Sequence, residues 1–269
     1  MRLKSTSTQR TYRYVRLALV GAALTLGIAL VQVLVTVGVV SSISASFYTP
    51  ARNVFVGVLF AIALALVALS GHSVEQVLLD LAALFVPVMA IVPTPVGAGE
   101  IPGFDPGCPV RCVPAADVAG IRLGMTTLVI IAAVAIATAV AISLVEHTMG
   151  TGKVLALAVA AVIVVGMGWW SLAASASFIR NGHLVAAVSF FALLALTALV
   201  SAAAARRAWR TVYATVAALM VLDLVWLAFA RSWLIGEVVA LALFLVFWLV
   251  QTVERWNEVD PGILPSARR

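Results

Sequence analysis

The run IRLGMTTLVIIAAVAIATAVAISLV, residues 121–145, carries no charged residue after Arg122 and decides the class of this protein. An apolar run of 18 or more residues is typical of a helix that crosses a bilayer. At 1.5 Å of rise per residue, about 20 residues cover the roughly 30 Å of hydrocarbon. The run therefore predicts a transmembrane helix.

Seven more runs of this kind raise the predicted number of spans to eight. Only 10% of the 269 residues are charged, against about 25% in soluble domains, and 64% are hydrophobic. The predicted fold class is all-α: a polytopic transmembrane helical bundle of about eight spans, without a soluble domain of any size. The eight predicted spans are Val15–Val40, Val54–Ser70, Val74–Val92, Ile121–Val145, Val154–Phe178, Leu184–Ala204, Thr211–Ala230 and Trp233–Gln251.

The basic residues predict how the bundle sits in its membrane. If all eight runs cross and the N-terminus is cytoplasmic, twelve of the 17 Lys and Arg residues fall inside and five outside. The third run is the weakest because it contains Glu75, Asp80 and Pro87. Leaving it out would move Arg206, Arg207, Arg210 and the C-terminal arginines outside. We expect cytoplasmic segments at 1–14 and 252–269, a bundle at 15–251, and an outer loop at 93–120 rich in Pro and Gly.

Composition also bears on location and partners. The first run is too long for the 7–15-residue apolar region of a cleaved signal peptide. The abundance of Arg, Ala and Val is a habit of high-G+C bacterial genomes, so the predicted location is the bacterial cytoplasmic (inner) membrane. The net charge of +6 is spread over short segments between spans and forms no basic face. This argues against nucleic acid as a partner and leaves the lipid bilayer as the main one.

The most distinctive polar stretch is SSISASFYTPARNVFVG, residues 41–57, at the predicted outer end of the first span. Its proline, Pro50, forces a turn. The topology places a histidine and a glutamate on the same face, each at the start of a later span. These residues predict an outward-opening polar pocket; the alternative is a set of boundary residues solvated at the headgroups. The candidate binding residues are Tyr48, Arg52, Asn53, His183 and Glu237.

Two acidic residues, Asp80 and Asp223, lie well inside apolar spans. Intramembrane carboxylates commonly line a polar pathway or pair with a partner. The two lie about 9 Å and about 18 Å from the inner ends of their spans, and this mismatch in depth argues against a shared proton. Either they face a functional cavity, or each is protonated or hydrogen-bonded to its helix neighbours.

The two cysteines, Cys108 and Cys112, both lie in the predicted outer loop, in the motif CPVRC. Because surroundings outside the cytoplasm are oxidising, a disulfide is expected there. Free thiols and a redox or metal role are the alternatives, and no nearby histidine completes a set of metal ligands.

The histidines give no sign of a metal or cofactor. His72 and His147 are predicted at the inner boundary and His183 at the outer one, and no H-x-x-x-H or H-E-x-x-H pair exists. No G-x-S-x-G motif, P-loop or dinucleotide fingerprint is present either. We therefore predict no metal site and no cofactor.

Four stretches carry a resemblance to a known family: SIS-x3-Y-T-P-x-R-x2-F-V-G (Ser42–Gly57), IVPTP (91–95), H-x-x-A-A-x-x-F-F (His183–Phe191) and FWLVQT-x-E-x-W (Phe247–Trp256). In these, and along most of its length, the chain resembles a family of uncharacterised bacterial multi-pass membrane proteins. The resemblance implies a multi-pass fold and brings no reaction with it. In hydropathy alone the chain is also similar to seven-helix ceramidase and progestin-receptor-like hydrolases, but it lacks their histidine pair, so their activity is not carried over.

The leading interpretation is an integral inner-membrane protein that acts as a binding or accessory component through an outward-facing polar pocket, with a membrane-protein partner or a lipid ligand. One alternative is a transporter of small molecules or lipids, with Asp80 and Asp223 along its path. The other is an intramembrane lipid hydrolase that acts through His183. The sequence leaves open whether the protein is an enzyme.

Overall fold

The structure is a computed structural model that describes residues 7–69, 71, 73–229 and 233–256. The expectations for His72, Arg231, residues 1–6 and residues 257–269 fall outside these residues. The described residues form eight α-helices, one short 3-10 helix (η1) and no strand, so the predicted all-α fold class is confirmed. The helices are α1 Ser7–Thr36, α2 Arg52–Ala68, α3 Val74–Ile91, α4 Ala115–Val145, α5 Thr151–Ala173, α6 Ser175–Ala204, α7 Arg207–Phe229 and α8 Trp233–Glu254, and η1 is Ser44–Tyr48.

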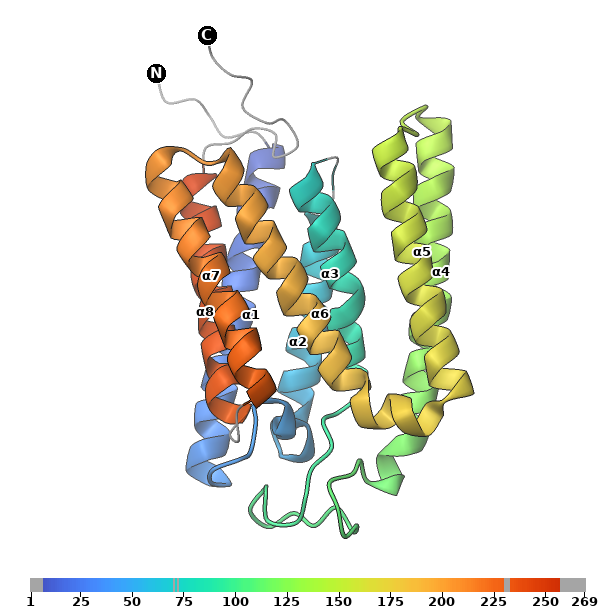
Figure 1. Cartoon of the computed structure of the whole chain (residues 1–269), viewed down its shortest axis with the longest axis vertical. Helices are drawn as coiled ribbons and strands as arrows, with labels where there is room; N and C mark the ends of the chain where they lie inside the picture. The colour runs from blue at the N-terminus through green and yellow to red at the C-terminus, as the bar shows by residue number, and fades with distance from the viewer. Residues whose placement is uncertain (1–6, 70, 72, 230–232, 257–269) are drawn as a thin grey trace.

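Seven of these helices are long and apolar enough to cross a membrane, which makes the chain a multi-pass membrane protein. The exception is α2, whose 17 residues fall just below the usual length. At 1.5 Å per residue it still spans about 25 Å. It carries the chain from the end of the bundle that holds the long loop to the end where α3 begins (Figure 1).

Six helices close into a ring. Each packs against the next in the order α1, α2, α3, α6, α7, α8, and α8 packs back against α1. Helix α1 begins and helix α8 ends at the same end of the ring, which we call the terminus end (Figure 1). Residues 92–114 form the long loop at the opposite end, the loop end.

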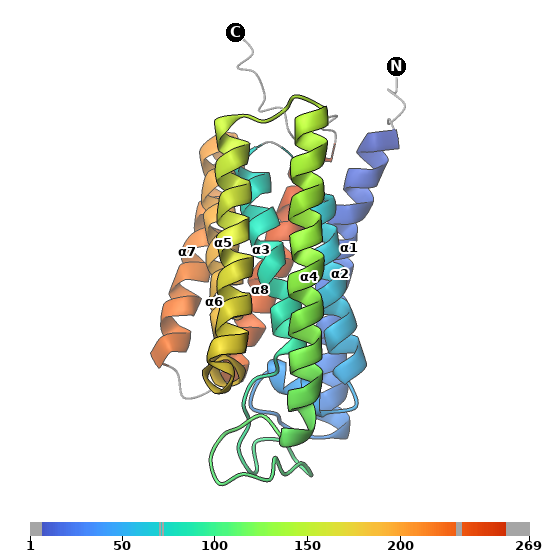
Figure 2. The ribbon, with the colours of Figure 1, turned by 90° about the vertical axis from the view of Figure 1, so that its right-hand side faces the viewer.

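The remaining two helices, α4 and α5, form a hairpin outside the ring (Figures 1 and 2). The hairpin packs against α3 and α6. Only 11% of the apolar window of each hairpin helix is buried, against 67% in α3. Apolar side chains left exposed on a membrane protein face lipid, so the hairpin presents most of its surface to the bilayer.

Two glycines set close helix contacts. A Cβ atom on Gly168 of α5 would lie 3.2 Å from Val129 of α4, so the glycine lets these two helices approach closely. A Cβ atom on Gly236 of α8 would lie 2.3 Å from Leu227 of α7. The absence of a side chain at Gly236 therefore permits the α7–α8 crossing.

The helix that looked weakest in the sequence, α3, is the most enclosed. Its polar first turn begins with a capping box, in which the Ser73 side chain accepts from the Gln76 amide and Gln76 reaches back to the Ser73 amide. Both Glu75 and Gln76 are buried. Polar residues fit this helix because it meets protein on most sides and not lipid.

Several helices extend beyond their predicted spans. Helix α6 begins at Ser175, nine residues before the predicted Leu184, and α4 begins at Ala115, inside the predicted 93–120 loop. At its C-terminal end α5 is instead shorter than predicted, because it ends at Ala173 and the residues from Ser175 to Phe178 belong to α6. Hydropathy marks where the chain is apolar, whereas backbone hydrogen bonding continues through polar residues past the membrane boundary. The change places His183 inside a helix.

Candidate functional site

A buried serine joins a histidine and a glutamate at the loop end of the ring. Ser44 is the first residue of η1, His183 lies in the third turn of α6, and Glu237 lies in the second turn of α8. The Ser44 Oγ atom is 2.8 Å from His183 Nε2 and 3.1 Å from Glu237 Oε1. The Ser44 amide donates to Glu237 Oε2 over 3.0 Å. We call these three residues the loop-end cluster.

The fourth contact fixes the histidine ring. Its Nδ1 atom lies 2.7 Å from the backbone oxygen of Val92, the residue that follows α3. A carbonyl oxygen only accepts, so Nδ1 carries a proton. In the neutral ring Nε2 is then an acceptor and requires the Ser44 hydroxyl proton.

The loop-end cluster needs one proton more than a neutral histidine, a serine and an ionised glutamate supply. Ser44 has a single hydroxyl proton, but it contacts both His183 Nε2 and a carboxylate oxygen of Glu237. Both contacts are hydrogen bonds only if one further proton sits on Glu237 or on Nε2. The cluster is therefore a short chain along which one proton can be relayed.

Beside the cluster, helices of the ring line a cavity of about 90 Å³. The loop-end cluster contributes its polar atoms, and the rest of the wall is apolar. The apolar lining comes from α1, residue 43, α2, α3, α6 and α8: Leu26, Ile43, Phe55, Leu59, Ile62, Val86, Met89, Ala187, Phe190, Phe191, Leu241 and Phe244. The cavity thus has one polar end and an apolar body.

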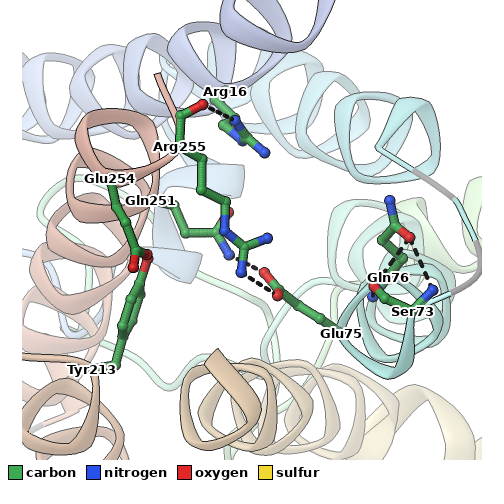
Figure 3. Close-up of polar contacts among 8 residues, drawn as sticks. All are labelled: Arg16, Ser73, Glu75, Gln76, Tyr213, Gln251, Glu254 and Arg255. Atoms are coloured by element: carbon green, nitrogen blue, oxygen red, sulfur yellow. Dashed lines mark hydrogen bonds and ion pairs between the residues drawn. The ribbon is translucent and has the colours of Figure 1, made fainter. Parts of the chain in front are cut away.

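The terminus end of the ring is closed by a second polar group, which we call the terminus-end cluster: Glu75, Gln251 and Arg255 (Figure 3). The Glu75 carboxylate from α3 accepts from Arg255 Nη2 at 2.5 Å and from Gln251 Nε2 of α8. Arg16 of α1 donates to the Arg255 backbone oxygen over 3.3 Å. The cluster connects α3 and α8 across the ring.

Large side chains fill the ring between the cavity and the terminus-end cluster. Trp248, Tyr213 and Phe247 are completely buried there. The Phe247 and Trp248 rings meet edge to face at 5.2 Å, and the Tyr213 hydroxyl donates to Glu254 over 2.6 Å (Figure 3). The cavity is therefore confined to the loop-end half of the ring.

Of the five predicted pocket residues, the structure brings together two, His183 and Glu237, and joins them through Ser44. Arg52 forms an ion pair of 3.1 Å with Asp117 of α4 and lies 3.9 Å from the Phe47 ring centre. Asn53 is exposed.

Tyr48, also predicted for the pocket, faces the loop. Its hydroxyl donates to the Thr94 backbone oxygen over 3.0 Å, and its ring stacks on Phe104 at 5.1 Å. Burial raises the pKa of the Tyr48 phenol, nearby Asp117 raises it further, and Arg52 opposes the shift. Tyr48 thus stays a neutral donor that ties η1 to the loop.

The two intramembrane carboxylates lie apart. Asp223 is buried on α7 and Asp80 is half-buried on α3, and α6 lies between these two helices in the ring. Neither residue lines the cavity.

A disulfide and backbone hydrogen bonds hold the long loop in place at the loop end of the ring. Cys108 and Cys112 are joined by a disulfide, and Cys112 pairs through its backbone with Val96. The Ser41 amide donates to the Glu100 backbone oxygen over 3.1 Å, next to the turn that holds Ser44. No group of three or more His, Cys, Asp or Glu residues suited to a metal occurs in the part of the chain that the structure describes.

Sequence reasoning missed Ser44 and the whole terminus-end cluster. Ser44 is one of four serines within six residues, and only the packing of α6 and α8 distinguishes it. Glu75 counted as evidence against a span, although Arg255 and Gln251 in the FWLVQT-x-E-x-W stretch carry its partners.

The fold and the two clusters define a multi-pass helical membrane protein with a cavity that is polar at one end. Comparison with protein-family models, curated protein sequences and solved structures finds no match.

Proposed function

We propose that this membrane protein binds a small amphipathic molecule in the loop-end cavity of its ring. The observation that carries the proposal is the position of Ser44, held between His183 and Glu237 at the polar end of an otherwise apolar cavity. A few convergent polar groups in an apolar pocket are the usual features of a small-molecule site. The hydrogen-bonding group of the ligand meets the loop-end cluster, and its apolar part lies among Phe190, Leu241 and Phe244.

The size of the cavity limits the ligand. At about 90 Å³ it is well below the roughly 300–1,000 Å³ of pockets that enclose drug-sized molecules. The ligand is therefore a short-chain alcohol, amine or acid, or the end of a longer molecule. Because Ser44 and Glu237 offer both a donor and acceptors, an alcohol satisfies them without adding a charge to the site.

The same geometry argues against the lipid hydrolase. Ser44 and His183 lie at the distance of a nucleophile and its base, but acyl transfer also needs donors for the developing oxyanion. The amides along this turn already have acceptors: Ser44 donates to Glu237, Ala45 to Ser42 Oγ and Ser46 to the Ile43 oxygen. A tetrahedral intermediate at Ser44 would find none of these three amides free.

Straight-chain 1-alkanols from butanol to octanol test the proposal on the purified protein in detergent. Binding to the folded state alone raises the melting temperature in proportion to RT ln(1 + [L]/Kd). We expect the shift at a fixed alkanol concentration to rise with chain length and then fall once the chain outgrows the cavity. Partition into the detergent micelle would instead rise without a maximum.

Two variants of α6 serve as the test and its matched control. Ala187 lines the cavity, so Ala187→Phe fills it and should abolish the maximum. Ala203 is exposed on the same helix, so Ala203→Phe adds the same ring outside the cavity and should preserve it. A maximum that survives Ala187→Phe, or a shift that rises with length in every variant, would refute the proposal.

We also propose how the protein is oriented, in which membrane it lies and to which family it belongs. The twelve-to-five division of basic residues and the disulfide in the long loop support cytoplasmic termini in a bacterial inner membrane, with the cavity near the outer face. The stretch Ser42–Gly57, which holds Ser44, supports membership of the resembling multi-pass family. Reporter fusions to the two ends test the orientation, and opposite readings at the two ends would overturn it.

Transport is the second candidate, because the ring is open to a cavity at one end and shut by a buried ion pair at the other. A carrier in which one of two gates is closed would have this arrangement. In proteoliposomes with a pH gradient, a proton-coupled carrier would give a proton flux that Glu237→Gln abolishes. A proton flux equal to that of protein-free liposomes would exclude proton coupling.

A further inference from the structure

A second and larger cavity, of about 450 Å³, lies outside the ring, between the α4–α5 hairpin and the start of α6. We call it the hairpin pocket. Its polar wall consists of Arg122 and Thr126 of α4, Ser171 of α5 and Ser175 of α6, and its apolar wall includes Met125 and Phe178. Ser171 lies near the last residue of α5 and Ser175 is the first residue of α6. The ends of membrane-spanning helices are where headgroups are expected.

Arg122 brings a charge to the pocket that the described residues do not neutralise. No carboxylate in the described part of the chain forms an ion pair with it. The nearest acidic residue along its own helix, Asp117, pairs with Arg52 at 3.1 Å. An arginine within an apolar helix near the membrane boundary extends its guanidinium toward headgroup phosphate, and its planar fork suits two phosphate oxygens.

The hydroxyl groups in the pocket add acceptors. Thr126 Oγ1 donates its proton to the Arg122 backbone oxygen over 2.9 Å, and Ser171 Oγ donates to the Gly168 oxygen over 2.8 Å. Both oxygens keep lone pairs that can accept from a ligand. A ligand that carries a phosphate and neighbouring hydroxyl donors therefore matches the pocket, and phosphatidylglycerol has both.

The surroundings of the pocket suit acyl chains. Leu172 lines the pocket and is 78% exposed, and Val165 and Val162 continue the exposed apolar face along α5. A soluble anion would gain nothing from this surface, whereas a lipid gains apolar contact along its whole length. The source of the phosphate is thus the bilayer.

We propose that the hairpin pocket is a binding site for the headgroup of an anionic glycerophospholipid, with Arg122 on its phosphate and the acyl chains along α4 and α5. The site is independent of the cavity in the ring. It would hold a lipid of the leaflet on the loop-end side and brace the otherwise loosely packed hairpin against the ring.

Native mass spectrometry of the whole protein, titrated with phosphatidylglycerol or with phosphatidylcholine, tests this site. The wild type should bind the first phosphatidylglycerol more tightly than the first phosphatidylcholine. Arg122→Gln should weaken that step on the order of tenfold, since one charge-assisted hydrogen-bonded pair is lost. Arg180→Gln, which removes an exposed charge of α6 that does not line the pocket, should leave it unchanged.

A second variant and a competition measurement complete the test. Ser175→Phe fills the pocket without a change of charge and should also remove the preference, which covers the case in which Arg122→Gln is poorly folded. Inorganic phosphate should not compete. Equal losses in Arg122→Gln and Arg180→Gln, competition by inorganic phosphate, or no preference in the wild type would each overturn the proposal.

Discussion

Both ends of the ring bring polar side chains into its centre, but only one leaves room beside them. At the terminus end, Glu75 accepts from both Gln251 and Arg255, and aromatic side chains fill the adjoining space. At the loop end, Ser44 bridges His183 and Glu237 at the wall of a cavity.

The difference separates a structural cluster from a binding site. Buried charges persist when each is paired and hydrogen-bonded, and such a group needs no ligand. The loop-end cluster instead lines a cavity that no side chain fills. A ligand or water in that cavity can therefore reach Ser44 and Glu237, whereas the aromatic side chains beside the terminus-end cluster leave no such space.

The largest expected effect follows from breaking the terminus-end pair. Glu75→Ala leaves the Arg255 guanidinium without its carboxylate at a site where Glu75 is only 6% exposed. Removing one partner of a buried ion pair typically costs about 3–5 kcal/mol. We expect a loss of this size in the free energy of unfolding, measured by thermal or SDS-induced unfolding of the purified protein.

The matched control replaces both partners. Glu75→Leu combined with Arg255→Met removes both charges, and replacing a buried pair with apolar residues is often neutral. The double variant should recover most of the lost stability. If it is as unstable as Glu75→Ala, the role of the cluster is not electrostatic and the comparison fails.

A smaller effect is expected at the loop end. Ser44→Ala removes the bridge between His183 and Glu237, and an unmade buried hydrogen bond costs about 1–3 kcal/mol. Because the cavity admits water, part of that loss should be recovered. The predicted destabilisation, again from unfolding curves, is thus below that of Glu75→Ala.

Another serine of the same turn provides the control. Ser46 is 2% exposed, and its Oγ atom has no hydrogen-bond partner among the described residues. Ser46→Ala should therefore be neutral or slightly stabilising. Equal destabilisation by the two changes would show that the turn responds to any loss of a hydroxyl and that Ser44 is not special.

The disulfide is expected to matter less than either cluster. Cys108→Ser opens a link between residues only four positions apart, and chain entropy gives at most about 2 kcal/mol for so small a ring. The loop has other ties to the bundle, including Tyr48 to Thr94, so the loop-end cluster should stay intact. A loss of the alkanol maximum in Cys108→Ser would contradict this and make the loop part of the site.

The sequence predicted each span because the signal is local. A run such as residues 121–145 is apolar whatever it packs against, so hydropathy located the eight helices of the described residues, seven of which are long enough to cross a membrane. The order of helices around the ring depends on contacts between distant segments, as in the 180-residue separation of Glu75 and Arg255. That is why Glu75 counted against its span when it is the centre of a cluster.

The candidate site was predictable only in part for the same reason. Topology alone put His183 and Glu237 on one face, and the structure joins them. It also put Arg52 there, but an arginine at a helix end pairs with whichever carboxylate comes near, and Asp117 belongs to a helix that the prediction started at Ile121. Ser44 had no local feature to distinguish it from Ser42 or Ser46.

The Arg52–Asp117 ion pair at the surface is expected to contribute least to stability. Arg52–Asp117 has the same chemistry as Glu75–Arg255, but the Arg52 side chain is 50% exposed. Exposed ion pairs contribute about 0–1 kcal/mol and are screened by salt. Arg52→Gln should therefore shift the free energy of unfolding by less than about 1 kcal/mol, and the shift should shrink further in concentrated salt, whereas the cost of Glu75→Ala should not. If the two ion pairs proved equally costly to break, burial would not be what distinguishes the two ends of the ring.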